Sequence, residues 1–134
     1  MEHELIAEWF RFADMDLLSA EHLQSLRPQP LEIICFLCQQ SAEKNLKGYL
    51  IYKGVVEPPK IHNLKFLIDM CLDYGERFSE IEKACSALTR YGVQPRYPNE
   101  IEILEHDMIK ALEYARQIRD FELLAAVMKE LGIK

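Results

Sequence analysis

Residues 31–53 read LEIICFLCQQSAEKNLKGYLIYK, and this stretch decides the fold. Its apolar residues recur at helical spacing around most of the circumference, which is typical of a helix buried on nearly all sides. When successive residues are placed about 100° apart, Gln40, Glu43, Lys44 and Lys47 share one narrow polar sector. The sequence therefore predicts a central helix with a single polar sector on an otherwise apolar surface.

The segment before this helix predicts a long first helix over about residues 3–26. Its apolar residues recur at spacings of three and four, and Pro28 and Pro30 end the pattern because proline lacks an amide hydrogen. The residues expected to face the core are Leu5, Trp9, Phe12, Ala13, Leu17, Ala20 and Leu23.

The segment after the central helix predicts two shorter helices. One is expected to start at His62 or Asn63, with Asn63 as its cap. The next is expected near Ser79, because Ser79 and Glu82 have the spacing of a capping box. The residues expected to face inward are Leu64, Leu67, Ile68 and Cys71 on the former, and Ile81, Ala84, Cys85 and Leu88 on the latter.

A fifth helix is predicted up to residue 118, and the apolar stripe changes phase after Asp120. Its expected inward residues are Ile101, Leu104, Met108, Ala111, Leu112, Ala115 and Ile118, whereas those of the final segment are Leu123, Leu124, Val127, Met128 and Leu131. The change of phase favours a short sixth helix folded back on the domain, with a subunit or partner contact as the alternative.

Long helices with short connections predict an all-α fold, an up-and-down bundle of four main helices with one or two short ones. We expect a single domain over residues 1–134, with its core at 5–118 and a C-terminal helix at 120–134 that is a candidate interface. The length of 134 residues fits one domain.

The composition excludes several classes of protein. A net charge of −6 argues against a general nucleic-acid-binding protein, which needs a surplus of Lys and Arg. No apolar run approaches the roughly 20 residues that span a bilayer. The start, Met1-Glu2-His3-Glu4, is acidic where a signal peptide is basic, so a cytoplasmic protein is expected.

The cysteines are interpreted as core residues rather than as ligands. Cys35 and Cys38 lie in an apolar helical run, and Cys71 and Cys85 stand alone, so the paired spacing of a zinc ribbon is missing. Free cysteine behaves mostly as a small hydrophobic residue. We expect no metal and no cofactor.

The polar sector of residues 31–53 has two interpretations. Lys44 and Lys47 repel each other unless an anion, a carboxylate or solvent intervenes, and Glu43 can screen them. The sector is therefore either a solvated face or a site for an anion or nucleotide phosphate, in which Gln40 supplies neutral hydrogen bonds.

Asp16 supports a site, because it falls within the apolar face of the first helix. A carboxylate there needs a cation, and Lys44, Lys47 and Arg96 are the candidates. The pair is either purely structural or part of a functional site.

The remaining candidate residues lie at a predicted helix start and in an irregular segment. His62 precedes a helix start, where the backbone dipole favours anions. Residues 91–99 form the longest irregular segment and are expected to wall the site. Within it Arg96 offers a planar fork for a phosphate or carboxylate, and Tyr97 offers an aromatic face for a base.

Together these residues form a more specific pattern, listed in chain order: Ala13-x-x-Asp16-Leu17-x-x-Ala20, Cys35-Phe36-x-x-Gln39-Gln40-x-x-Glu43-Lys44-x-x-Lys47-Gly48, His62-x-Leu64 and Arg96-Tyr97-Pro98. This pattern resembles the HEPN domain family (higher eukaryote and prokaryote nucleotide-binding), in particular its short stand-alone prokaryotic branch. The resemblance covers residues 5–118.

The resemblance implies a homodimeric bundle that works with a nucleotidyltransferase-fold partner in a module similar to toxin–antitoxin pairs. Ribonuclease branches of the family carry an Arg and a His a few residues apart. Here His106 follows Arg96 by ten positions, and His22 follows Arg11 by eleven. This spacing favours binding over cleavage.

Three functional hypotheses follow from the residues and the resemblance. The leading hypothesis is a nucleotide- or anion-binding module, with Gln40, Lys44, Lys47, His62, Arg96 and Tyr97 as ligand-binding residues and with Asp16 and Glu43 in support. The first alternative is a metal-independent endoribonuclease toxin that uses His62 and Arg96 on RNA. The second is a structural subunit whose polar sector only pairs across helices.

Overall fold

The structure is a computed structural model that describes residues 2–57, 60, 63–92 and 102–133. Every regular element in these residues is helical, so the prediction of an all-α fold is confirmed. The elements are α1 (Glu2–Leu23), α2 (Leu31–Tyr52), α3 (Leu64–Leu72), the 3-10 helix η1 (Glu76–Ile81), α4 (Glu82–Leu88), the 3-10 helix η2 (Thr89–Tyr91), α5 (Glu105–Arg119) and α6 (Glu122–Glu130). None of the helices in these residues is both long and apolar enough to cross a bilayer.

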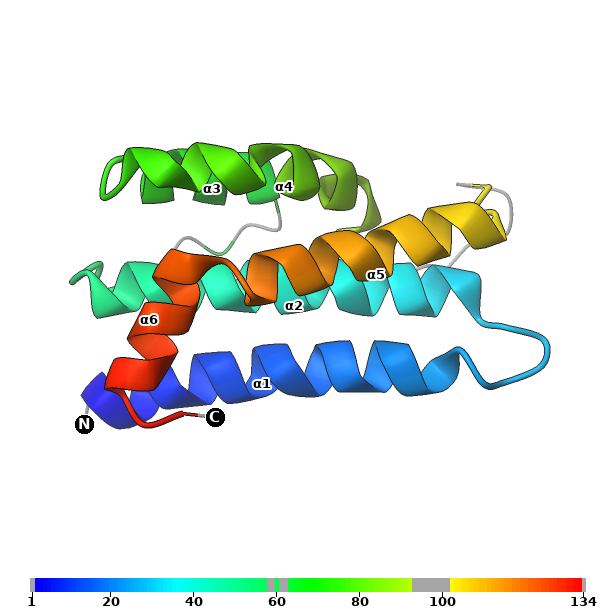
Figure 1. The fold of residues 1–134 in the computed structure, drawn as a ribbon, viewed down its shortest axis with the longest axis horizontal. Coiled ribbons are helices and arrows are strands. Elements are labelled where there is room, and N and C mark those ends of the chain that lie inside the picture. Colours follow the sequence, from blue (N-terminus) through cyan, green and yellow to red (C-terminus); the bar gives the residue numbers. More distant parts are fainter. Residues whose placement is uncertain (1, 58–59, 61–62, 93–101, 134) are drawn as a thin grey trace.

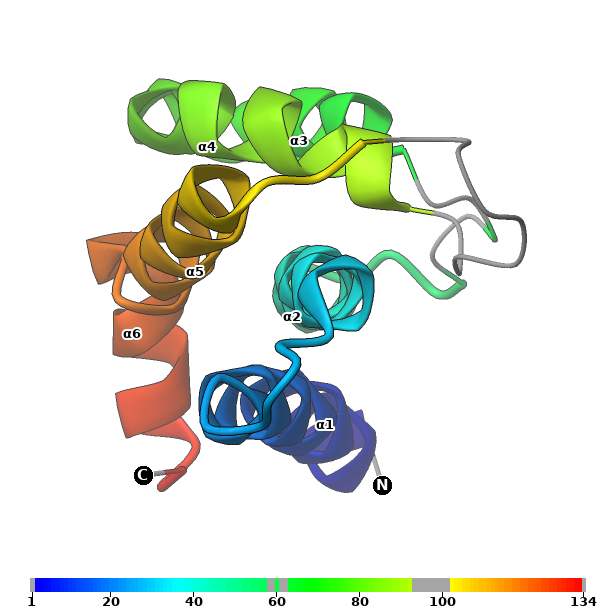
Figure 2. The same ribbon diagram turned by 90° about the vertical axis from the view of Figure 1, so that its right-hand side faces the viewer.

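Helix α2 occupies the centre of the bundle. Viewed along its axis, it has α1 on one side, α5 on another, and α3 with α4 on a third (Figure 2). Helices α1 and α2 run antiparallel, side by side along most of their lengths (Figure 1). The buried apolar residues of α2 are Ile34, Cys35, Cys38, Ala42, Leu46, Tyr49, Leu50 and Ile51. The predicted central helix is therefore observed.

Helix α1 buries a face that is rotated from the expected one. Leu5 and Phe12 are 50% and 47% exposed, so their predicted place in the core is wrong. The buried side chains are Ile6, Phe10, Ala13, Leu17 and Ala20. Both sets have helical spacing, and the choice between them depends on which side of α1 meets α2.

Gly48 determines how closely α1 and α2 approach. A Cβ atom built at Gly48 would lie 3.2 Å from two ring atoms of Phe10 and 3.2 Å from Cβ of Trp9. A side chain at this position would press against Phe10, which is 2% exposed, so that the ring would have to shift. The glycine thus permits the close contact between α2 and the side of α1 that bears Phe10.

Helix α3 begins as expected, whereas α4 does not. Oδ1 of Asn63 accepts hydrogen bonds from the backbone amides of Lys65 at 2.9 Å and Phe66 at 3.3 Å, which confirms the predicted cap. Ser79 lies within the 3-10 helix η1, and α4 starts at Glu82 without a side-chain cap, so the predicted capping box is wrong. The tighter turn before α4 places Ser79 inside a helical segment rather than ahead of one.

The chain turns sharply between α5 and α6. Helix α5 ends at Arg119, and α6 folds back, with Leu124 and Val127 buried and Phe121 packed 5.1 Å from the ring centre of Phe78. The phase change after Asp120 thus corresponds to a short sixth helix on the bundle. Leu104, which was expected to face inward, precedes α5 and is 48% exposed.

Replacing Gly48 with Leu is expected to destabilise the protein by about 1–3 kcal/mol, because the added side chain overpacks the contact with Phe10 and Trp9. Chemical denaturation measures this loss. The matched control Ala126→Leu adds the same side chain on an exposed position of α6 and should leave the unfolding midpoint nearly unchanged. Equal midpoints for the two variants would contradict the close packing at Gly48.

Asn63→Ala is expected to lower the free energy of unfolding by about 1 kcal/mol, since the variant leaves the first amides of α3 without their side-chain acceptor. Ser79→Ala is the matched control, because the Ser79 side chain caps no helix. If Ser79→Ala proved as costly as Asn63→Ala in thermal unfolding, the observed start of α4 would be incorrect.

Candidate functional site

The α2 polar sector, consisting of Gln40, Glu43, Lys44 and Lys47, lies largely below the surface. Glu43 and Lys47 are 5% and 6% exposed, and Gln40 and Lys44 are half-buried. Charged side chains are rarely buried unless they are paired, because they lose their hydration. The partners of each charge therefore decide what this sector can do.

Lys44 is paired with Asp16 across the α1–α2 contact. Its Nζ donates to Oδ2 of Asp16 at 2.5 Å, and the two side chains are 25% and 18% exposed. Lys44 was one of the cations expected to neutralise Asp16. The ammonium group has further N–H groups beyond the one that Asp16 accepts, and it retains access to solvent.

Lys47 is held deeper, within α2 itself. Its Nζ donates to Oε2 of Glu43 at 2.8 Å, and Nε2 of Gln39 donates to Oε1 of the same carboxylate at 3.3 Å. The Lys47 Nζ also lies 5.9 Å from the ring centre of Trp9. Neither Gln39 nor Trp9 was among the expected site residues. The antiparallel pairing of α1 with α2 brings Trp9 to this position, and spacing within one helix does not reveal such pairing.

The charges of the polar sector balance once Asp16 of α1 is included. Lys44 and Lys47 are each hydrogen-bonded to a carboxylate, Asp16 and Glu43 respectively. The sector therefore differs from a bare cationic patch, and a phosphate must compete with Asp16 to reach Lys44.

Three polar atoms of α2 are buried without a hydrogen-bond partner among the described residues: Oε1 of Gln40, Oγ of Ser41 and Nδ2 of Asn45. A buried polar atom without a partner costs about 1–3 kcal/mol, so a ligand or water that reaches it gains that energy. Gln40 lies one helical turn from Lys44. This neighbourhood thus offers an acceptor beside a donor, which suits a group that both donates and accepts hydrogen bonds.

The described residues bring together Asp16, Gln40, Glu43, Lys44 and Lys47. The expected site residues His62, Arg96 and Tyr97 lie outside the described residues, as does the 91–99 segment from residue 93 onward.

The four cysteines are free and buried, as the apolar surroundings in the sequence indicated. Burial raises the pKa of the Cys35 thiol to about 12 and that of the Cys85 thiol to about 12, and it also raises the pKa values of Cys38 and Cys71. These thiols stay protonated at neutral pH, whereas metal binding and thiol exchange need the thiolate. Within the described part of the chain, no group of three or more His, Cys, Asp or Glu residues could hold a metal ion.

Comparisons with known proteins give one family and one similar structure. The family model described as "HEPN domain" matches residues 6–126. A crystal structure of an archaeal HEPN homologue aligns with a TM-score of 0.66 and 23% sequence identity, over 94% of this chain and 97% of that chain. No curated protein matches. The structural likeness shows a shared fold, and the family match extends over most of the chain.

Removing either partner of the Asp16–Lys44 pair is expected to cost about 1–3 kcal/mol, between the values for exposed and fully buried pairs, because the other charge stays half-buried. The double variant Asp16→Leu/Lys44→Met should recover much of that loss. A double-mutant cycle by urea unfolding measures the coupling. Additive losses would mean that the two side chains do not interact in solution.

Proposed function

The chain belongs to the HEPN family, and on this premise we propose that it is a nucleotide- or anion-binding protein whose ligand lies against the α2 polar sector. The supporting observation is the polar sector itself, placed on the most buried helix of the bundle. A buried ion pair is often no more stabilising than apolar residues of the same size. Stability alone therefore gives little reason for lysines and carboxylates at these positions, whereas ligand binding does.

Lys44 is the cation that the ligand contacts in this proposal. Its ammonium group is partly accessible and has N–H groups left after the bond to Asp16. Asp16 holds Lys44 in place before the ligand arrives. Gln40, whose Oε1 atom lacks a partner among the described residues, accepts a hydrogen bond from the ligand.

Lys47 is more deeply buried than Lys44 and supports the site. Its Nζ donates to Glu43 at 2.8 Å, so its ammonium group is held in place and its charge is largely compensated. The proposal assigns a phosphate contact to Arg96, stacking on a base to Tyr97 and a hydrogen bond to His62.

We extend this proposal to partners. The protein acts as a homodimer with a nucleotidyltransferase-type protein, in a two-component module like a toxin–antitoxin pair. Two observations are compatible with such contacts: the side chains of Leu5 and Phe12 on α1 are about half exposed, and Met15 is 51% exposed. Apolar side chains that gather on a surface commonly mark contacts between proteins.

A structural role for the polar sector is the second candidate function. The observation in its favour is that both lysines already have carboxylate partners at hydrogen-bond distance. The two candidates differ in one respect: only the binding protein loses affinity for a ligand when Lys44 is neutralised.

Titration calorimetry with ATP, GTP and inorganic phosphate tests the proposed function. A nucleotide is expected to bind with a Kd of about 1 mM or tighter, and Lys44→Met should weaken binding at least about tenfold by removing a charge-assisted hydrogen bond. Lys65→Met is the matched control, because Lys65 lies exposed on α3 in an ion pair with Asp69.

The Lys44→Met variant leaves the carboxylate of Asp16 without its cation, which can disturb the fold. The double variant Asp16→Leu/Lys44→Met removes both charges, so a loss of nucleotide affinity in it reports on the lost ligand contact rather than on an unpaired carboxylate. Absence of nucleotide binding, or equal affinity in the Lys44→Met and Lys65→Met variants, would rule out the proposed site.

A further inference from the structure

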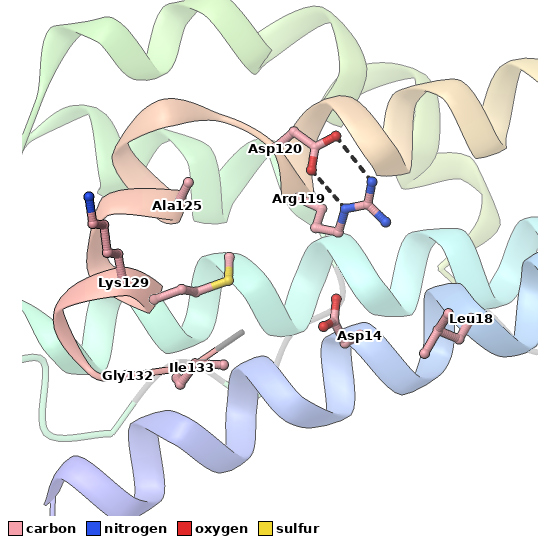
Figure 3. Close-up of a pocket in the computed structure, with 9 residues that line it drawn as sticks. Asp14, Leu18, Arg119, Asp120, Ala125, Lys129, Gly132 and Ile133 are labelled. Atoms are coloured by element: carbon pink, nitrogen blue, oxygen red, sulfur yellow. Dashed lines mark hydrogen bonds and ion pairs between the residues drawn. The ribbon is translucent and has the colours of Figure 1, made fainter.

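A separate pocket lies where α6 folds back beside α1 (Figure 3). Its volume is about 610 Å³, within the range of about 300–1,000 Å³ that is typical of small-molecule sites. Helix α1 contributes Asp14 and Leu18, and the end of α5 contributes Arg119 and Asp120. The residues from α6 and its C-terminal turn are Ala125, Met128, Lys129, Gly132 and Ile133. Asp14 is two residues from Asp16, so the pocket opens on a different side of α1 from the polar sector.

The end of α6 forms the apolar wall of this pocket. Gly132 has a φ of +75°, and the amides of Gly132 and Ile133 donate to the carbonyls of Lys129 at 3.1 Å and Met128 at 2.8 Å. These bonds form a Schellman motif, in which the residue after the glycine turns back onto the helix. Ile133 and Met128 therefore line the same pocket.

Asp14 is the unusual residue of the pocket. Its carboxylate is half-buried and points from α1 toward Arg119 and Asp120 (Figure 3), yet it makes no hydrogen bond or ion pair with any described residue. Burial raises its pKa above the ordinary value. Arg119 opposes that shift, and Asp120 and Glu21 add to it. The pocket thus contains a partly dehydrated carboxylate that is attracted by the charge of Arg119 but makes no hydrogen bond to it.

Arg119 is already occupied by Asp120. Its Nε donates to Oδ1 at 2.8 Å and its Nη2 donates to Oδ2 at 3.1 Å, in a two-bond pairing. The ammonium group of Lys129 points away from Asp14 in Figure 3. The described side chains therefore leave Asp14 as the charge that a ligand would neutralise.

We propose that this pocket binds a small organic cation, a primary ammonium or guanidinium group on a short apolar chain. The cation hydrogen-bonds the carboxylate of Asp14, and the apolar chain lies against Met128, Ile133 and the exposed side chain of Leu18. The site and its ligand are independent of the proposed nucleotide site. A cation is favoured over an anion because the guanidinium of Arg119 already donates to both oxygens of Asp120, whereas the carboxylate of Asp14 accepts no hydrogen bond from a described residue.

Three probes of similar length and different charge test the proposal: hexylamine, 1-hexanol and hexanoate. Amide NMR signals of the native protein are followed for Asp14, Leu18 and residues 125–133. Hexylamine is expected to shift these signals and to bind at least about tenfold more tightly than 1-hexanol or hexanoate, because only the amine forms a charge-assisted bond. Equal binding of 1-hexanol, tighter binding of hexanoate, or no binding of hexylamine would overturn the proposal.

The Asp14→Asn variant tests whether Asp14 binds the cation. Hexylamine affinity should fall at least about tenfold in this variant and should stay unchanged in Asp73→Asn, which alters an exposed carboxylate at the end of α3.

The variant should unfold at the same temperature as the unmodified protein or a higher one, since it removes a partly desolvated charge that makes no hydrogen bond, and desolvation outweighs the attraction by Arg119. If Asp14 instead had a structural role, Asp14→Asn would lower the unfolding temperature, and that result would overturn the assignment. Ala125→Trp fills the pocket without changing its charge and should also abolish hexylamine binding.

Discussion

The contact between α1 and α2 is the constraint on which the rest of the structure depends. Gly48 lets Phe10 and Trp9 approach the α2 backbone, and a Cβ atom there would lie only 3.2 Å from either residue. With α1 packed in this rotation, Asp16 lies within hydrogen-bond distance of Lys44. A wider separation of the helices would leave the carboxylate and the ammonium group each half-buried and unpaired.

In this rotation, α1 contributes residues to two candidate sites on its two sides. Asp16 faces α2 and completes the polar sector, whereas Asp14 faces the pocket beside α6. Asp16 is hydrogen-bonded to Lys44, whereas Asp14 makes no hydrogen bond to a described residue and is near Arg119, which is itself hydrogen-bonded to Asp120. Two aspartates two positions apart thus have different surroundings, because α2 packs against one side of α1 and α6 lies near the other.

Several features could be predicted from residues close together in the chain. The helical spacing of residues 31–53 indicated the central helix, and an Asn ahead of an apolar run indicated the cap at Asn63. Charge alone indicated that Asp16 needs a cation and gave Lys44, Lys47 and Arg96 as candidates, and the structure pairs it with Lys44. The family resemblance, drawn from the order of the polar motifs, agrees with the HEPN match over residues 6–126.

The tertiary structure decided what local spacing left open. The sequence by itself determined that the chain is helical and roughly where the long helices run, because periodicity and caps involve residues within a turn or two of each other. It missed the 3-10 helix before α4. It did not determine whether Ile6 and Phe10 or Leu5 and Phe12 enter the core, since each pair has the spacing of a helical face. Nor did it reveal the burial of Glu43 and Lys47 or the pocket at Asp14. Those depend on how helices far apart in the chain pack together, and that packing is set by contacts such as the one at Gly48.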